Sequence, residues 1–159
     1  MIEKLLNTKK INYSSNLNGD HLKQKIEDLF KQSSLSFVGK FTSSNEFAAY
    51  DKWSIISWYL PNFKRKSAYL KGEIFQSEKG TLLKLNTRPN TMLSAFPILF
   101  VLIGIIILIA AELNKENMLF LIIGSVFILT GILNYLLGIF SRNRLENNFE
   151  KNLDLQKLK

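Results

Sequence analysis

The stretch that decides the fold is ILFVLIGIIILI, which occupies residues 98–109 and has no polar side chain. It lies inside a longer segment, residues 92–111, that carries no charged residue. Twenty such residues rise about 30 Å as an α-helix, which is the hydrocarbon thickness of a bilayer. The segment therefore predicts a membrane-spanning helix over residues 92–111.

A second uncharged segment, MLFLIIGSVFILTGILNYLLGIF, occupies residues 118–140. Only the loop 112–117 separates it from the first, so the two helices are predicted to be antiparallel neighbours in a hairpin over residues 92–140. The alternative is a pair of core helices in a soluble protein. It is disfavoured because the remaining residues could not cover two such helices on all sides.

The charged residues around the hairpin predict its orientation. The first 91 residues hold 15 Lys and Arg against 8 Asp and Glu, the loop 112–117 holds one against two, and residues 141–159 hold five against three. Cytoplasmic flanks of membrane spans carry the excess of Lys and Arg. We therefore expect a two-pass protein with both termini cytoplasmic. The compact Lys/Asn/Ile-rich chain, which shows no eukaryotic targeting feature, favours a bacterial cytoplasmic (inner) membrane.

Small residues recur every seven positions in both predicted spans, and this spacing stays nearly on one helix face. Folding the hairpin about its loop places Gly104 opposite Gly124 or Ser125, and Pro97 opposite Gly131 or Ile132. The hypothesis is that these strips form the helix contact. The alternative is that glycine is simply common in membrane helices.

One amide, Asn134, lies deep in the second span, where an unmatched polar group is costly. We expect it to bond a backbone carbonyl or a partner chain. The residues predicted to pack the helices or dock a partner are Gly104, Gly124, Gly131, Asn134 and Gly138.

The predicted fold class is an α+β membrane protein whose residues 1–91 form a soluble cytoplasmic domain. An amphipathic helix capped by Asp20 carries apolar residues at Leu22, Ile26, Leu29 and Phe30. Alternating or β-rich runs then predict a small antiparallel sheet of four or five strands, at residues 35–42, 53–60, 68–76 and 81–86, with 46–50 as the further strand. A hairpin turn is predicted at residues 77–80, where Gly80 supplies a positive φ.

Residues 141–159 are predicted to form a C-terminal amphipathic helix in the cytoplasm. Leu145, Phe149 and Leu153 share one face, and Arg142 is placed to pair with Glu146. This helix either packs on the sheet, which needs a cover, or lies on the membrane surface. The sheet is the favoured alternative.

Chemistry-bearing motifs are sparse. The chain has no cysteine and one histidine, His21, which is expected to be exposed in the first turn of its helix. It has no glycine-rich phosphate loop, metal-ligand spacing or nucleophile elbow. The sequence therefore predicts a non-enzymatic protein without catalytic residues, metal ligands or cofactors.

The densest aromatic and basic cluster is WSIISWYLPNFKRK, residues 53–66. Such clusters suit the headgroup region of an anionic leaflet, so Trp58, Lys64, Arg65 and Lys66 are candidate lipid contacts. The alternative is a core strand followed by a solvated turn. Nucleic acid is not expected as a partner, because the bias of Lys and Arg toward the cytoplasm already explains much of the basicity.

Three functions remain open at this point. The leading one is an accessory or scaffold subunit of a bacterial inner-membrane complex, with membrane lipids and other integral membrane proteins as partners. The second is an immunity-type membrane protein that protects against a toxin or bacteriocin. The third is a lipid-surface module that acts through the basic turn.

Overall fold

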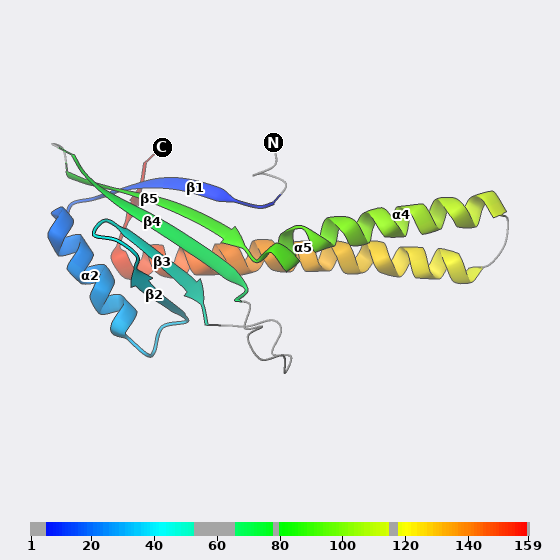
Figure 1. Cartoon of the computed structure of the whole chain (residues 1–159), viewed down its shortest axis with the longest axis horizontal. Coiled ribbons are helices and arrows are strands. Elements are labelled where there is room, and N and C mark those ends of the chain that lie inside the picture. Colours follow the sequence, from blue (N-terminus) through cyan, green and yellow to red (C-terminus); the bar gives the residue numbers. More distant parts are fainter. Residues whose placement is uncertain (1–5, 53–65, 78–79, 115–117, 159) are drawn as a thin grey trace.

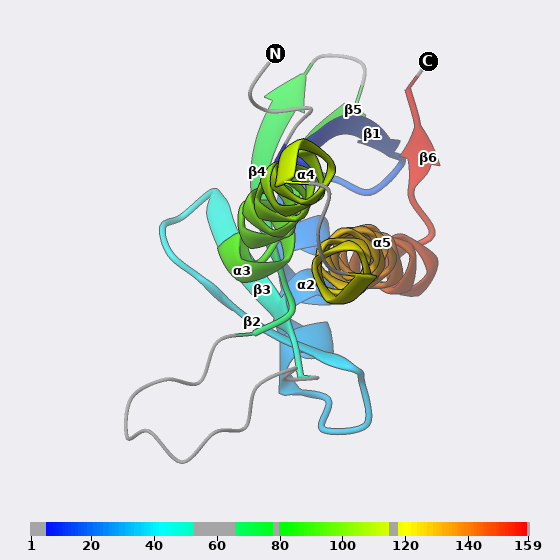
Figure 2. The ribbon, with the colours of Figure 1, turned by 90° about the vertical axis from the view of Figure 1, so that its right-hand side faces the viewer.

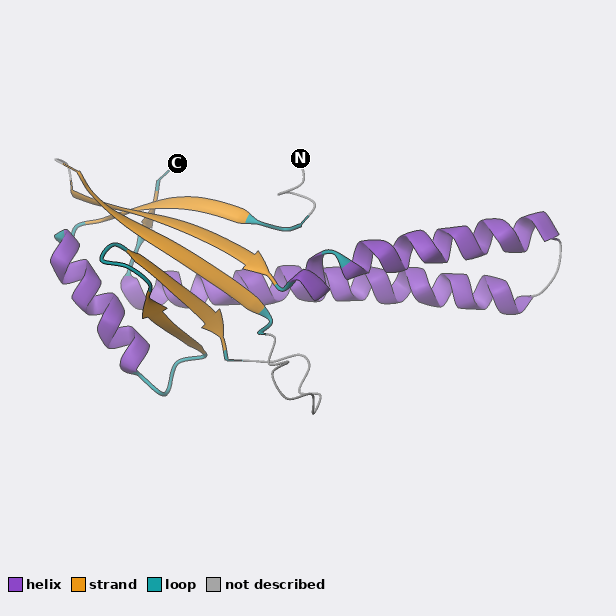
Figure 3. Ribbon diagram, viewed as in Figure 1, coloured by secondary structure: helices purple, strands orange, loops and turns teal. Residues whose placement is uncertain are grey.

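In the computed structural model, which describes residues 6–52, 66–77, 80–114 and 118–158, a β-sheet with helices on one face continues into a long helical hairpin (Figure 1). The elements in chain order are β1 (Lys9–Ser15), α2 (Gly19–Lys31), β2 (Phe37–Phe41), β3 (Glu46–Asp51), β4 (Ala68–Ser77), β5 (Gly80–Pro89), α3 (Thr91–Ser94), α4 (Phe96–Asn114), α5 (Met118–Leu153) and β6 (Gln156–Lys157). The long strands of the sheet slant toward the base of the hairpin (Figure 3).

The described strands form one antiparallel sheet of six strands, in the order β2-β3-β4-β5-β1-β6. Four of the expected strand regions correspond to β2, β3, β4 and β5, and the run predicted at residues 53–60 lies outside the described residues. The prediction missed β1, which pairs with both β5 and β6. Its sequence KKINYSS has only two apolar residues, Ile11 and Tyr13, so its alternation is too short to stand out.

The strands β4 and β5 form a hairpin at the predicted place, with residues 78–79 outside the described residues. The two strands pair from Ala68 opposite Pro89 to Ser77 opposite Gly80. Gly80 has φ +125°, a conformation that L side chains rarely adopt.

One face of the sheet is covered by α2 and by the C-terminal part of α5. Leu145, Phe149 and Leu153 are buried in the same core as Leu22 and Ile26. The expectation that the C-terminal helix packs on the sheet is therefore confirmed.

Two local predictions were wrong. Asn18, not Asp20, is the N-cap of α2, because Asn18 has extended backbone angles and its carbonyl accepts from the Leu22 amide at 2.9 Å. Asp20 lies in the first helical turn, where its charge complements the helix dipole. Glu146 does not take Arg142 as its partner, since Lys9 of β1 binds its carboxylate at 2.7 Å.

The helix α5 is one uninterrupted element that joins the predicted second span to the predicted C-terminal helix. Residues 139–153 contain neither proline nor glycine, so nothing in the sequence breaks the helix where the apolar segment ends. In Figure 2 the hairpin helices α4 and α5 are seen nearly end-on, side by side.

Two helical segments, Thr91–Leu113 and Met118–Leu153, are long and apolar enough to cross a membrane. They do not resemble core helices of a soluble domain, because most of their large apolar side chains face outward. Ile106 is 65% exposed and Leu119 is 60% exposed. This outward-facing apolar surface needs an apolar environment.

Candidate functional site

The predicted glycine positions lie inside the contact between α4 and α5. A Cβ atom added to Gly104 would lie 2.7 Å from the Gly124 carbonyl oxygen, and one added to Gly131 would lie 2.8 Å from the Pro97 carbonyl oxygen. These separations are shorter than any Cβ contact that real structures tolerate. Gly104 therefore faces Gly124 and Gly131 faces Pro97, as the folded hairpin predicts.

Gly138 continues the strip toward the sheet, since an added Cβ would lie 2.6 Å from the Leu93 carbonyl oxygen of α3. In the contact between α4 and α5, the rings of Phe100 and Phe127 stack with their centroids 5.5 Å apart. Because α3 and α4 occupy the strip, a partner helix could reach it only by opening the hairpin. The geometry therefore favours helix packing over partner docking as the role of these glycines.

Asn134 bonds within its own helix. Its Nδ2 donates to the Thr130 carbonyl at 2.8 Å, one turn earlier. This is one of the two partners expected from the sequence, and it satisfies the amide donor without a second chain.

The predicted headgroup contacts fall mainly outside the described residues. Trp58, Lys64 and Arg65 are among these, so only Lys66 is placed. The Lys66 ammonium lies 5.3 Å from the centre of the Tyr50 ring on the neighbouring strand β3. The Lys66 carbonyl accepts from Asn90 Nδ2 at 2.7 Å, which fixes this residue beside the start of α3.

Ion pairs to two buried carboxylates fasten α5 to the sheet. The Glu146 side chain is 1% exposed and binds Lys9 Nζ at 2.7 Å. The Asp51 side chain is 2% exposed and receives the Arg144 guanidinium, with Nε at 3.1 Å. Lys157 Nζ also lies 3.9 Å from the Glu146 carboxylate. Loss of either pair would remove a close counter-charge from a buried carboxylate, which is destabilising.

A second group of contacts joins α5 to the far edge of the sheet. Tyr13 OH donates to Glu150 Oε2 at 3.2 Å, and Lys157 Nζ lies 2.8 Å from the same carboxylate. Burial raises the pKa of Tyr13 well above its usual range, and the carboxylates of Glu146 and Glu150 raise it further. The bond to Glu150 also raises the pKa of Lys157.

Sequence reasoning missed the contact that joins the N-terminal residues to α5. Arg142 Nη1 donates to the Asn7 carbonyl at 2.8 Å, and Tyr135 OH donates to Asn7 Oδ1 at 3.3 Å. Asn7 has φ +56°, a conformation that asparagine tolerates better than most residues. No local spacing could reveal this contact, because more than 120 residues separate its two sides.

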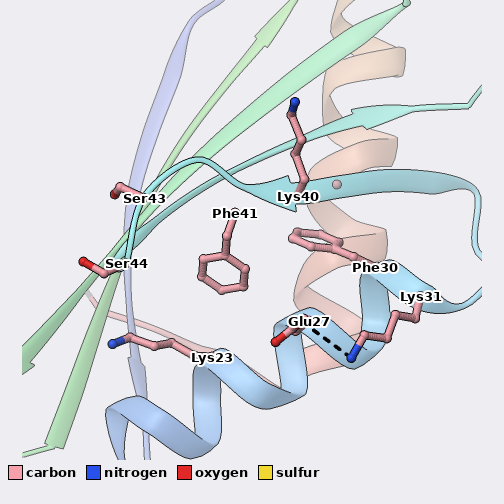
Figure 4. Close-up of a pocket in the computed structure, with 9 residues that line it drawn as sticks. Lys23, Glu27, Phe30, Lys31, Lys40, Phe41, Ser43 and Ser44 are labelled. Carbon is pink, nitrogen blue, oxygen red and sulfur yellow. Dashed lines mark ion pairs between the residues drawn. The ribbon is translucent and has the colours of Figure 1, made fainter.

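A hollow of about 490 Å³ lies between α2 and β2 (Figure 4). Lys23, Lys31 and Lys40 line it, but the Lys40 ammonium points away from the other two. The Lys31 ammonium is 3.5 Å from Glu27, and Phe30 and Phe41 fill the floor. The Lys23 ammonium in turn lies 3.5 Å from Asp20, so two of the three lysines at the hollow are already paired with a carboxylate.

Within the described ranges, no group of three or more His, Asp and Glu side chains is placed to hold a metal ion. His21 lines a shallow hollow with Gln24 and Asp28.

No protein-family model, curated protein or solved structure matches this chain. A function can therefore be inferred only from the sequence and the geometry of this chain itself.

Proposed function

We propose that this chain is a non-enzymatic accessory or scaffold subunit of a bacterial inner-membrane complex. In this proposal α4 and the apolar part of α5 cross the membrane, and the sheet domain stands on its cytoplasmic side. The observation that carries the proposal is the continuity of α5 from Met118 to Leu153. One rigid helix is at once half of the hairpin and part of the core of the domain.

The contacts at the base of the hairpin support rigid presentation of the domain. β5 ends at Pro89 and α3 begins at Thr91, so one residue, Asn90, separates the sheet from the first span. Asn90 is largely buried, and its Oδ1 accepts from the Met92 amide at 3.0 Å. A partner bound to this domain would be held at a fixed place relative to the membrane.

The proposed orientation rests on basic residues at the domain end of the hairpin. Lys84 and Arg88 precede the first span, and Arg142 and Arg144 follow the second. The connecting loop carries one cation and two acids. This distribution favours a cytoplasmic domain and an external loop.

Orientation is tested by cysteine labelling, since the natural chain has no cysteine. Leu113→Cys, at the loop end of α4, is expected to react with a membrane-impermeant maleimide in intact cells. Asn147→Cys, on the exposed side of α5, is expected to react only after the membrane is permeabilised. The opposite pattern would overturn the proposed orientation.

The accessory role is tested by quantitative mass spectrometry of a tagged full-length chain, expressed in its own host and extracted in mild detergent. A reproducible stoichiometric partner is expected. Retention of the partner should fall in Phe149→Ala, which removes a fully buried ring between α5 and the sheet, and persist in Asn147→Ala. Recovery of the wild-type chain without any protein partner would refute the accessory role.

A further inference from the structure

The sheet has a second face, opposite the one that α2 and α5 cover. Side chains alternate between the two faces, so in β5 the buried Leu85 and Thr87 point to the core while Lys84, Asn86 and Arg88 point to the other face. Lys84 and Arg88 are exposed and Asn86 is partly buried. In the described part of the chain this outer face carries no covering helix.

Charge on the outer face changes with distance from the hairpin. Strand pairing aligns its side chains in rows across the sheet. The row nearest the hairpin contains Val38, Tyr50, Tyr69 and Arg88, the second contains Lys40, Ala48, Lys71, Asn86 and Lys10, and the third contains Glu46, Glu73, Lys84 and Asn12. The two rows near the hairpin are basic and aromatic, and acidic side chains begin only in the third.

These two rows lie close to the base of the hairpin. At about 3.3 Å per residue along β5, Arg88 is about 7 Å and Asn86 about 13 Å from Asn90, which caps α3. Lys66 flanks the first row through its contact with Tyr50. With the hairpin inserted as proposed above, extended Lys and Arg side chains at these positions are near enough to reach toward the headgroup layer.

A hollow of about 260 Å³ lies at the centre of the two rows. Tyr50, Tyr69, Lys71, Asn86 and Arg88 are among the residues that line it. The Arg88 guanidinium lies 5.8 Å from the centre of the Tyr69 ring. The Asn86 Oδ1 atom is buried and has no hydrogen-bond partner within the described residues, so this hollow offers an unused hydrogen-bond acceptor.

We propose that this outer face, centred on Lys71, Asn86 and Arg88, binds the phosphate headgroup of an anionic phospholipid in the leaflet beside the hairpin. The cations supply charge complementarity to the phosphate, the tyrosines suit the membrane interface, and the Asn86 Oδ1 atom can accept from a hydroxyl of the headgroup, such as those of phosphatidylglycerol. The proposal rests on insertion of the hairpin but not on the accessory role. It names binding residues in the sheet, outside the cluster at residues 53–66.

The test is native mass spectrometry of the full-length protein in detergent micelles titrated with phosphatidylglycerol or phosphatidylcholine. Each cation near an anionic lipid surface contributes about fivefold to binding, so Lys71→Gln/Arg88→Gln is expected to bind phosphatidylglycerol about 30-fold more weakly than wild type. The matched control is Lys84→Gln/Lys151→Gln, which removes the same charge from the third row and from α5. It should lose less than about threefold.

A charge-preserving variant separates binding from folding. Lys71→Arg/Arg88→Lys should keep phosphatidylglycerol binding within about threefold, since both cations remain. Circular dichroism and the midpoint of thermal unfolding check that the neutralised variant folds. If it unfolds, the single variants replace it, each with an expected loss of about fivefold.

Three outcomes would overturn the proposal. Equal binding of phosphatidylglycerol and phosphatidylcholine by the wild type would show no anionic preference. Equal losses in the two neutralised double variants would show only an effect of net charge. Displacement of the lipid by millimolar inorganic phosphate would point to a soluble phosphate compound instead. The absence of a protein partner would leave lipid binding unaffected, so failure of the accessory role is distinguishable.

Discussion

Replacement of Phe149 by alanine tests how the hairpin is joined to the sheet. The Phe149 ring is fully buried and contacts three other phenylalanine rings, with centroid distances of 5.4 Å to Phe47, 5.8 Å to Phe37 and 6.4 Å to Phe30. Removing such a ring leaves a cavity and destabilises a domain by about 3–5 kcal/mol. A domain of this size is stable by about 5–15 kcal/mol, so this variant loses a large share of its stability.

The effect is measured by hydrogen exchange of the full-length protein in lipid nanodiscs. Each 1.4 kcal/mol corresponds to tenfold in the opening equilibrium, so slowly exchanging amides in β2 and β3 should exchange more than about 100-fold faster in Phe149→Ala. Amides in the outer part of the hairpin should keep their protection, because the glycine contact between α4 and α5 is separate from the sheet core.

The control is Asn147→Ala, on the exposed side of the same helix turn, for which a change within about 0.5 kcal/mol is expected. If protection of residues 37–51 were the same in Phe149→Ala as in wild type, the core contact between α5 and the sheet would be disproved. Equal loss of protection in the hairpin would show that the two parts unfold as one unit.

Three further predictions concern other contacts of α5. Gly131→Leu should open the hairpin, because a Cβ atom there meets the Pro97 carbonyl. Crosslinking between cysteines introduced into α4 and α5 should then fall several-fold, and undiminished crosslinking would contradict this. A double-mutant cycle of Arg144→Gln and Asp51→Asn, followed by chemical unfolding, should give a coupling of about 0.5–3 kcal/mol, whereas strict additivity would exclude a stabilising pair. Because the pKa of Tyr13 is raised in the folded protein, its contribution to the free energy of unfolding is complete below pH 10 and is lost as the pH rises above it. Above pH 10 the free energy of unfolding of the wild type should therefore fall faster than that of Tyr13→Phe, by up to about 1.4 kcal/mol per pH unit. Parallel pH profiles of the two proteins would refute this.

Elements with a strong hydrophobic period could be predicted from the sequence. Residues 19–31 of α2 and residues 141–153 of α5 show such a period, the two apolar segments stand out by their length without a charge, and β4 and β5 are joined where Gly80 marks the turn. The burial of Leu145 and Phe149 against the sheet follows from the same reasoning, since a sheet face with apolar side chains needs a cover.

The missed elements lack a local signal. β1 lies between β5 and β6 in the sheet, yet the only fully buried apolar side chain it contributes is Tyr13. β6 has two residues, too few for any period. Their places are set by pairing with strands far away in the sequence, and a tertiary constraint of this kind overrides local propensity.

The ion pairs, too, are set by residues far away in the sequence, so local spacing did not predict them. A spacing of four residues on a helix predicted a pair between Arg142 and Glu146. The structure instead pairs Glu146 with Lys9, 137 residues away, because β1 and α5 pack together and leave this carboxylate 1% exposed. A local helix pair contributes only about 0.2–0.5 kcal/mol, whereas a buried carboxylate without a cation is far more costly. The long-range pair between Lys9 and Glu146 therefore forms in place of the local pair.

The same ionic contacts make the continuous helix α5 a fixed connection between the hairpin and the sheet. Helix continuity alone does not fix the sheet to the hairpin, since a helix could extend from the hairpin without binding anything. Here Arg142, Arg144 and Glu146 follow the apolar segment directly, and they bind the residues before β1, the end of β3 and the start of β1. Two segments of the domain, the start of β1 with the residues before it and the end of β3, are thus fastened to α5 within about one and a half helical turns. A rotation of the apolar part of α5 must therefore turn the sheet, and with it the basic outer face, in the same direction.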